Sequence, residues 1–236
     1  MMVSSEDSKL ACKRFYPNVE QRVRAVRFAV NPPQPITDLE AKAVADRYGL
    51  PERYFFMPNQ FWAHKNHMLV VQALKLLRER GKAVTVVATG KQLDPRNAAY
   101  VPALMVAVQE AGLATEFLMP GMVPYDDLMP LMQASTAFLN PSLFEGWSTT
   151  VEEARAAGVP MVLSDLAVHR EQAGDQAAYF DRHSAKALAK CLSDFVPLSP
   201  DKRRALRDTA RVQANERVSR FANEFVELAL AAACAR

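Results

Sequence analysis

The stretch that most constrains the fold covers residues 140–165, NPSLFEGWSTTVEEARAAGVPMVLSD. It starts at the carboxyl end of an apolar strand, residues 137–139, and turns through a proline and a glycine. A run of helix formers at residues 151–157 follows, and a second apolar strand occupies residues 159–163. Strand, turn, helix and strand form one βαβ unit, and ligands of such folds bind in the crevice outside the carboxyl ends of the strands.

Two carboxylates and three hydroxyl residues belong to that crevice. Glu145 lies in the loop and Glu153 about one turn inside the helix, with seven residues between them. Ser148, Thr149 and Thr150 stand near the helix start, where free backbone N–H groups can receive a phosphate. The pattern therefore indicates a site for a phosphorylated ligand.

A wider set of residues around these carboxylates carries a family resemblance. The segment FEGWSTTVEEA resembles the Glu-x7-Glu signature of retaining GT-B glycosyltransferases, the large group-1 family that uses nucleotide-diphospho sugars. Eight fixed positions within about twenty residues match in register, which makes the signature far more specific than a lone glycine motif. These positions are Pro141, Ser142, Glu145, Gly146, Glu153, Ala154, Gly158 and Pro160.

The resemblance implies a role for each of the two carboxylates. Glu153 would accept hydrogen bonds from the ribose hydroxyls of the nucleotide, and Glu145 would hold hydroxyls of the transferred sugar as a catalytic residue. Carboxylates suit both tasks because each offers two acceptor oxygens to a vicinal diol. Two alternatives stay open from the residues alone: a pair of surface acids, or the general acid and base of a glycosidase.

The segment PNQFWAHK would clamp the diphosphate of the donor. In the family, a Gly-Arg pair follows the first strand of this domain, and a lysine comes five residues after the arginine. Lys65 falls in register as the catalytic and diphosphate-binding lysine, whereas Asn59 and Gln60 replace Gly-Arg. Gln60 can donate a hydrogen bond but brings no charge. Either the site has less positive charge, or another cation compensates, with His64 and His67 nearest in sequence.

The remaining contacts of the predicted site involve backbone groups. The run Ser148–Thr150 replaces the usual Gly-x-Pro of the family and would still supply N–H groups to the phosphates. By the same resemblance, the backbone around Val123 would contact the nucleotide base. His169 is interpreted as structural. The resemblance implies a UDP-, GDP- or ADP-sugar as the ligand. No metal constellation, P-loop or dinucleotide motif stands in the sequence, so no metal or other cofactor is predicted.

Apolar strands alternate with amphipathic helices along most of the chain, which is typical of an α/β fold with a parallel, Rossmann-like sheet covered by helices on both faces. This is the fold of a GT-B carboxyl-terminal domain. The proline-rich segment NPPQP marks the main boundary. We expect a remnant of the amino-terminal acceptor domain with a linker at 1–35, the donor-binding domain at 36–198 and carboxyl-terminal helices at 199–236. In the first of these, a helix is predicted at residues 6–15 and a strand at 23–30.

Composition excludes several classes of protein. The net charge of +3 is mild and its cations are scattered, so nothing demands nucleic acid or an anionic membrane as partner. Three widely spaced cysteines fit a reducing cytoplasm better than a disulfide framework. The chain starts without the apolar core of a signal peptide, and no apolar run reaches membrane-spanning length.

The resemblance implies a donor-binding domain for retaining, metal-independent transfer of a hexosyl group in glycan biosynthesis, and the composition favours a cytoplasmic location. Since most of the acceptor-binding domain would be absent, this chain alone is expected to transfer nothing. The uncovered interdomain face would favour a homodimer. The alternative is a non-catalytic nucleotide-sugar-binding or partner-docking module, which the short amino-terminal segment and the uncharged Gln60 both favour.

Overall fold

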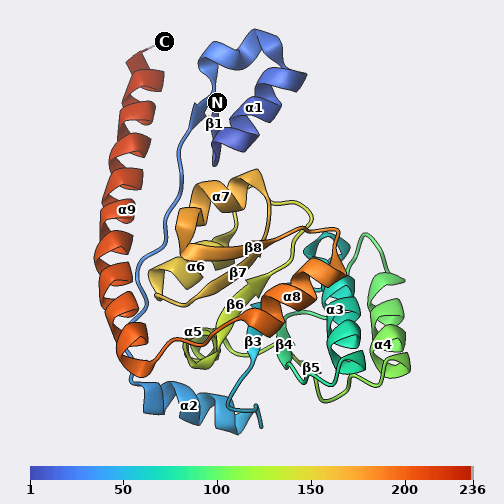
Figure 1. Ribbon diagram of the computed structural model, residues 1–236. Helices are drawn as coiled ribbons and strands as arrows, with labels where there is room; N and C mark the ends of the chain where they lie inside the picture. Colours follow the sequence, from blue (N-terminus) through green and yellow to red (C-terminus); the bar gives the residue numbers. More distant parts are fainter. Residues whose placement is uncertain (235–236) are drawn as a thin grey trace.

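A computed structural model describes residues 1–234 and contains a six-stranded parallel sheet in the order β5-β4-β3-β6-β7-β8. Figure 1 shows this sheet at the centre of the molecule. All six strands are short; the four inner ones are almost entirely buried, as expected for a sheet that is covered on both faces, whereas the two edge strands are only partly buried. The strands are β3 (Phe55–Pro58), β4 (Val86–Thr89), β5 (Phe117–Gly121), β6 (Ala137–Asn140), β7 (Met161–Ser164) and β8 (Ala177–Phe180).

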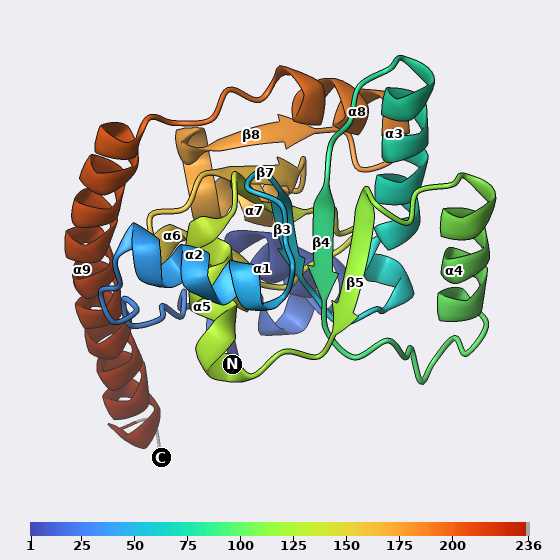
Figure 2. The same cartoon turned by 90° about the horizontal axis from the view of Figure 1, so that it is seen from below.

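Helices cover both faces of the sheet, which confirms the predicted α/β fold. On one face, α3 (His67–Glu79), α4 (Tyr100–Glu110) and α8 (Ala185–Asp194) enclose one apolar core. On the other, α2 (Asp38–Arg47), α5 (Tyr125–Ala134), α6 (Thr149–Ala156) and α7 (Ala167–Ala173) enclose a second. The view from below shows α2 and α5 on one side of the strands and α3 and α4 on the other (Figure 2).

The strand order places a crevice at one point of the sheet. From β3, the chain proceeds outward through β4 and β5, then returns to β6 beside β3 and proceeds outward through β7 and β8 in the opposite direction. The order therefore reverses between β3 and β6. In parallel sheets of this kind, the loops at the carboxyl ends of the two strands diverge at the reversal and leave a ligand-binding crevice.

Local sequence signals start the helices that flank this crevice. Thr37 and Glu40 form a reciprocal capping box at the start of α2, where the Thr37 N–H donates to the Glu40 carboxylate at 2.7 Å. Ser148 caps α6, which begins at Thr149 rather than at residue 151 as predicted. Strand β5 extends to Gly121, which pairs with Thr89 of β4.

The amino-terminal segment forms a small unit of its own. It comprises β1 (Met2–Val3), α1 (Glu6–Phe15), the 3₁₀ helix η1 (Pro17–Arg22) and β2 (Arg24–Ala25), with β1 and β2 paired in parallel. The strand predicted at 23–30 is thus only two residues long, because its partner β1 is equally short. Figure 1 shows the chain leaving β2 and passing beside α9 to reach α2.

One carboxylate attaches this unit to the rest of the molecule. Glu171, on α7, accepts hydrogen bonds from the backbone N–H of Glu6 at 2.9 Å and from Arg27 Nε at 2.5 Å. The first contact satisfies a free N–H group at the start of α1, where a negative charge is favourable. Where carboxyl-terminal helices were predicted at 199–236, the described residues form the single helix α9 (Pro200–Cys234).

Helix α9 packs closely against the end of α6. Ala210 and Ala214 are its buried residues. Gly158, which follows α6, has a φ of +62°, and a Cβ atom there would lie 2.6 Å from the Cα atom of Arg207. The glycine of the sequence signature is therefore required twice here, by its backbone conformation and by the approach of α9. Among residues 1–234, no helix combines the length and apolarity needed to cross a bilayer.

Candidate functional site

Asn140, the last residue of β6, organises the loop that follows the strand. Its buried side-chain oxygen accepts hydrogen bonds from the backbone N–H of Ser142 at 3.1 Å and from the Ser142 hydroxyl at 2.6 Å. Its Nδ2 donates to Ser148 Oγ at 3.2 Å. One amide side chain thus joins the two ends of the loop that carries Glu145, and holds the loop at the carboxyl edge of the sheet.

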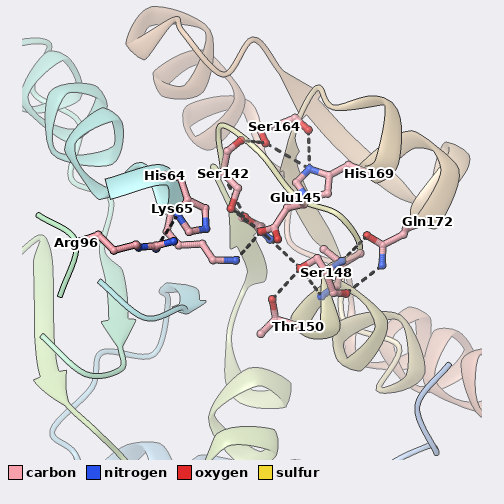
Figure 3. Close-up of polar contacts among 12 residues, drawn as sticks. His64, Lys65, Arg96, Ser142, Glu145, Ser148, Thr150, Ser164, His169 and Gln172 are labelled. Carbon is pink, nitrogen blue, oxygen red and sulfur yellow. Dashed lines mark hydrogen bonds and ion pairs between the residues drawn. The ribbon is translucent and has the colours of Figure 1, made fainter. Parts of the chain in front are cut away.

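Glu145 and Lys65 meet in the crevice. Lys65 Nζ lies 2.6 Å from Glu145 Oε1, although 80 positions separate the two residues in the sequence. The side chains are only 13% and 9% exposed, respectively. The Ser142 hydroxyl also lies 2.7 Å from this Oε1, so its single proton is shared between the Glu145 oxygen and the Asn140 oxygen. Asn140 Nδ2 lies 3.4 Å from Oε1. Figure 3 shows Lys65 extending from the β3 side to the carboxylate.

The environment of Glu145 favours its charged form. Burial alone would raise the pKa of this carboxyl group, but the positive charge of Lys65 and hydrogen bonds from Lys65 and Ser142 outweigh burial. The pKa of Glu145 is therefore held below its ordinary value. All the hydrogen bonds named above reach Oε1. The second oxygen, Oε2, accepts none within the described part of the chain and remains available to a ligand.

Two further contacts fix the relative position of the loops. Lys65 ends the short 3₁₀ helix η2 (Ala63–Lys65) that follows β3, and Asn66 then adopts a left-handed conformation with φ 61°. The Asn66 Nδ2 donates to the carbonyl of Pro141 at 3.1 Å, and Leu143 N donates to the carbonyl of His64 at 2.8 Å. The loops after β3 and β6 are thus joined before any ligand arrives.

The start of α6 presents two free N–H groups beside this pair. Ser148 uses its own N–H, which donates to Gln172 Oε1 at 3.1 Å, and its hydroxyl caps Val151 N at 3.4 Å. Within residues 1–234, no hydrogen bond takes up the N–H groups of Thr149 and Thr150. Of the three predicted residues, Ser148 therefore orients the helix, while the other two present donors.

Adjacent glutamates on α6 have different environments. Glu152 is 1% exposed and forms ion pairs with Arg155 at 2.7 Å and Arg217 at 3.6 Å, so it attaches α6 to α9. The half-buried side chain of Glu153 makes no hydrogen bond or ion pair within the described residues. Burial raises the pKa of Glu153. An unpaired, half-buried carboxylate beside a crevice is typical of a ligand-binding group.

The structure does not bring every predicted residue to the same point. Gln60 is exposed, and its Oε1 accepts a hydrogen bond from the backbone N–H of Lys91 at 3.0 Å, which ties the β3 loop to the β4 loop. Val123 follows β5 and packs its side chain on the second apolar core. No contact within the described chain joins either residue to Lys65 or Glu145.

Gln172 and Arg96 were not predicted at the site, and His169 was interpreted as structural. Gln172, on α7, holds Ser148 from both sides, since its Nε2 also donates to the Ser148 carbonyl at 3.0 Å. His169 is fully buried, and its Nδ1 donates to the carbonyl of Ser164 at 2.8 Å, which leaves Nε2 as an acceptor without a partner among the described residues. The loop after β4 contributes Arg96, whose Nη2 lies 3.5 Å from His64 Nδ1. The Gln172 and Arg96 contacts join segments that are distant in sequence, and no local sequence pattern signalled them.

Comparison with solved structures identifies the fold. A glycosyltransferase from Rickettsia africae superposes with a TM-score of 0.82 at 17% sequence identity, over 96% of this chain and 62% of that one. The Anabaena protein HepE, solved in complex with UDP and glucose, superposes with a TM-score of 0.78 at 15% identity, over 96% of this chain and 61% of that one. At identities this low, the superpositions establish the fold alone. It is the GT-B carboxyl-terminal fold predicted from the signature.

Curated relatives match parts of the chain at the level of sequence. Mannosylfructose-phosphate synthase of Agrobacterium fabrum is 23% identical over 132 residues, which are 55% of this chain and 29% of the relative. The 2-deoxystreptamine glucosyltransferase of Streptomyces kanamyceticus is 29% identical over 125 residues, 52% of this chain and 31% of the relative. The chain thus matches less than a third of the length of each of these two proteins.

A family model spans the whole sheet. The model of glycosyl transferases group 1 matches residues 45–213, from the end of α2 to the first half of α9. That range includes every strand of the six-stranded sheet and both loops that carry Lys65 and Glu145. The crevice at the strand reversal, the two carboxylates and the helix start therefore all lie inside the matched region, and the chain belongs to the group 1 glycosyl transferase family.

Proposed function

We propose that this chain is the donor-binding domain of a glycosyltransferase. It binds a nucleotide-diphospho sugar in the crevice between β3 and β6 for retaining, metal-independent transfer of a hexosyl group. One observation carries the proposal: Lys65 and Glu145 meet at 2.6 Å beside the free N–H groups of α6. A cation, a carboxylate and oriented backbone donors at one crevice match the phosphate and the hydroxyls of such a donor.

In the proposed complex, the diphosphate lies between Lys65 and the start of α6. The N–H groups of Thr149 and Thr150 donate to phosphate oxygens, and Lys65 supplies a positive charge. Negative charge develops on the diphosphate as the glycosidic bond breaks, so oriented donors in a water-poor crevice stabilise the transition state more than the bound substrate. In this proposal, lysine and helix together perform the electrostatic work of a bound cation.

The two carboxylates hold the sugars of the donor. Glu145 is kept in place through Oε1, so Oε2 can accept a hydroxyl of the transferred sugar without loss of the existing contacts. Glu153 has no partner within the described chain, and ribose hydroxyls would hydrogen-bond its charged form, which burial disfavours. In this proposal, one carboxylate accepts hydrogen bonds from the transferred sugar at one end of the diphosphate, and the other accepts them from the ribose at the other end.

The acceptor substrate is proposed to bind to a second domain. This chain covers 62% of the length of the Rickettsia glycosyltransferase and 61% of that of HepE. Closure of an acceptor-binding domain over the crevice would exclude water and bring the acceptor to the donor. We therefore expect these 236 residues to bind nucleotide and to transfer no sugar by themselves. A cytoplasmic location, a role in glycan biosynthesis and a homodimer remain predictions.

Calorimetric titration tests the donor site. UDP, GDP and ADP are titrated into the full chain, beginning with UDP because HepE was solved with UDP. The variant Glu153→Ala is measured beside it, with Glu110→Ala at the exposed end of α4 as a matched control. We expect saturable binding of one nucleotide, weakened at least about tenfold in Glu153→Ala and unchanged in the control. Absence of binding by all three nucleotides would contradict the proposal.

The second candidate is a non-catalytic nucleotide-sugar-binding or partner-docking module. The uncharged Gln60, whose side chain holds Lys91 of the neighbouring loop, favours it. An acceptor-binding domain added in trans separates the two functions. Sugar transfer that depends on Glu145 and Lys65 would support a glycosyltransferase. Nucleotide binding without sugar transfer, whichever acceptor-binding domain is added, would support a non-catalytic module.

A further inference from the structure

The charge balance of the crevice is incomplete for a diphosphate. Lys65 is already neutralised by Glu145 at 2.6 Å. Gln60, at the position where the family has arginine, is uncharged and hydrogen-bonded to the β4 loop. The N–H groups of α6 contribute only partial charge. The proposed function therefore requires at least one more cation near the phosphates.

The two histidines nearest to Lys65 do not supply that charge. His67 is fully buried and stacks on Phe61 with ring centroids 4.3 Å apart, and burial lowers its pKa to about 3. Burial, followed by the positive charge of Lys65, also lowers the pKa of His64. Both rings are therefore neutral at pH 7, and a cation has to come from another element.

Arg96 reaches the crevice from the loop after β4. Asp94, which is 3% exposed, accepts hydrogen bonds from Ala63 N at 2.8 Å and from Arg96 N at 3.0 Å, so one carboxylate joins this loop to η2. The guanidinium group lies 5.0 Å from the ring centre of Trp62 and 3.5 Å from His64 Nδ1. Figure 3 shows Arg96 and Lys65 on the same side of Glu145, with His64 beside them.

The Arg96 side chain is ion-paired through Nε, and its guanidinium, though in contact with Trp62 and His64, is largely exposed. The side chain is 63% exposed, and its only acidic neighbour among residues 1–234 is Asp94, at 3.6 Å from Nε. The carboxylate of Asp94 already accepts two backbone N–H groups. The guanidinium therefore keeps donors for a ligand, and the planar fork suits a diphosphate better than a point charge does.

On these grounds, and resting on the proposed function, we propose that Arg96 is the second cation of the diphosphate subsite. It provides, from the β4 loop, the positive charge that Gln60 lacks at the β3 loop. In the ligand-free chain, stacking on Trp62 and contact with His64 keep the Arg96 guanidinium beside Lys65. From this position it can turn toward the phosphates.

Calorimetry on Arg96→Gln tests this role. For whichever of UDP, GDP and ADP binds the unaltered chain, we expect an affinity loss of about tenfold, the usual size for one charge-assisted contact. Lys91→Gln removes an exposed cation from the same loop and should change the affinity less than about twofold. Weak binding of the corresponding nucleoside, which has no phosphate, should be the same in all three proteins.

A second variant distinguishes charge from folding. In the Arg96→Gln background, Gln60→Arg places an arginine where the family has one, and we expect it to restore most of the lost affinity. Equal diphosphate binding by Arg96→Gln and the unaltered chain overturns this inference and leaves the proposed function standing. A loss of nucleoside binding as large as that of the diphosphate also overturns it. Absence of nucleotide binding by the unaltered chain overturns both.

Discussion

The two sides of the crevice are built differently. The glutamate loop, residues 140–148, contains buried polar side chains that hydrogen-bond one another and hold Glu145 from one oxygen. The cation loops, residues 59–66 and 90–99, are tied together by Asp94 but expose Gln60 and most of Arg96. Glu145 and its partner Lys65 are therefore positioned before a donor arrives, whereas the exposed Arg96 keeps freedom to follow the phosphates. Changes on the first side should cost stability, and changes on the second should cost binding.

The largest effect is expected from Asn140→Ala in the glutamate loop. The substitution leaves the Ser142 N–H and the hydroxyls of Ser142 and Ser148 without a shared partner in a buried region. We expect the free energy of unfolding to fall by about 2–3 kcal/mol, measured by urea denaturation. Asn97→Ala, at an exposed position in a cation loop, is the control and should change stability by less than about 0.5 kcal/mol. Equal losses in the two variants would contradict the comparison.

Lys65→Gln should mainly affect binding. The variant removes the one cation that touches Glu145 within residues 1–234, so the affinity for the nucleoside diphosphate should fall at least tenfold, or about 1.4 kcal/mol. Titration calorimetry measures the loss. Lys75→Gln, on the exposed face of α3, serves as control. An affinity within twofold of the unaltered chain would show that the phosphates bind elsewhere.

Glu153→Gln is expected to stabilise the ligand-free chain slightly. Burial raises the pKa of Glu153, so its charged form costs free energy in the folded state at neutral pH. The neutral amide avoids this cost, and we expect a gain in unfolding free energy of less than about 1 kcal/mol together with weaker nucleotide binding. A loss of stability on this substitution would instead indicate a structural role for the carboxylate.

The pH dependence of stability should report the opposite environment of Glu145. The folded-state pKa of Glu145 is lowered, so its contribution to stability is present above the ordinary pKa near 4.5 and disappears as pH falls through the folded-state value. Urea denaturation of the unaltered chain and of Glu145→Gln between neutral and acidic pH isolates this contribution. The difference in unfolding free energy between them should shrink on acidification. A constant difference would show that the Lys65 contact does not depend on charge.

Sequence patterns predicted most of the sheet, whereas the roles of the predicted site residues stay predictions. Apolar strands placed the loops of Lys65 and Glu145 at one edge, and Ser148 was placed near the helix start that it caps. Long-range polar pairs could not be predicted from the sequence, because no local pattern indicates that Gln172 bonds to Ser148 or that Asp94 accepts the Ala63 N–H. The strand predicted at 23–30 is short for the same reason, since its length depends on a partner far earlier in the chain.

A crystal structure of the chain with the nucleoside diphosphate that binds it tests the central claim most directly. The account predicts the diphosphate within hydrogen-bond distance of Lys65 Nζ and of the N–H groups of Thr149 and Thr150, with the ribose hydroxyls on Glu153. The Glu145–Lys65 contact should persist beside it. A nucleotide bound elsewhere, such as between the proline-rich linker and the arginines of α9, with the β3–β6 crevice unchanged, would contradict the account.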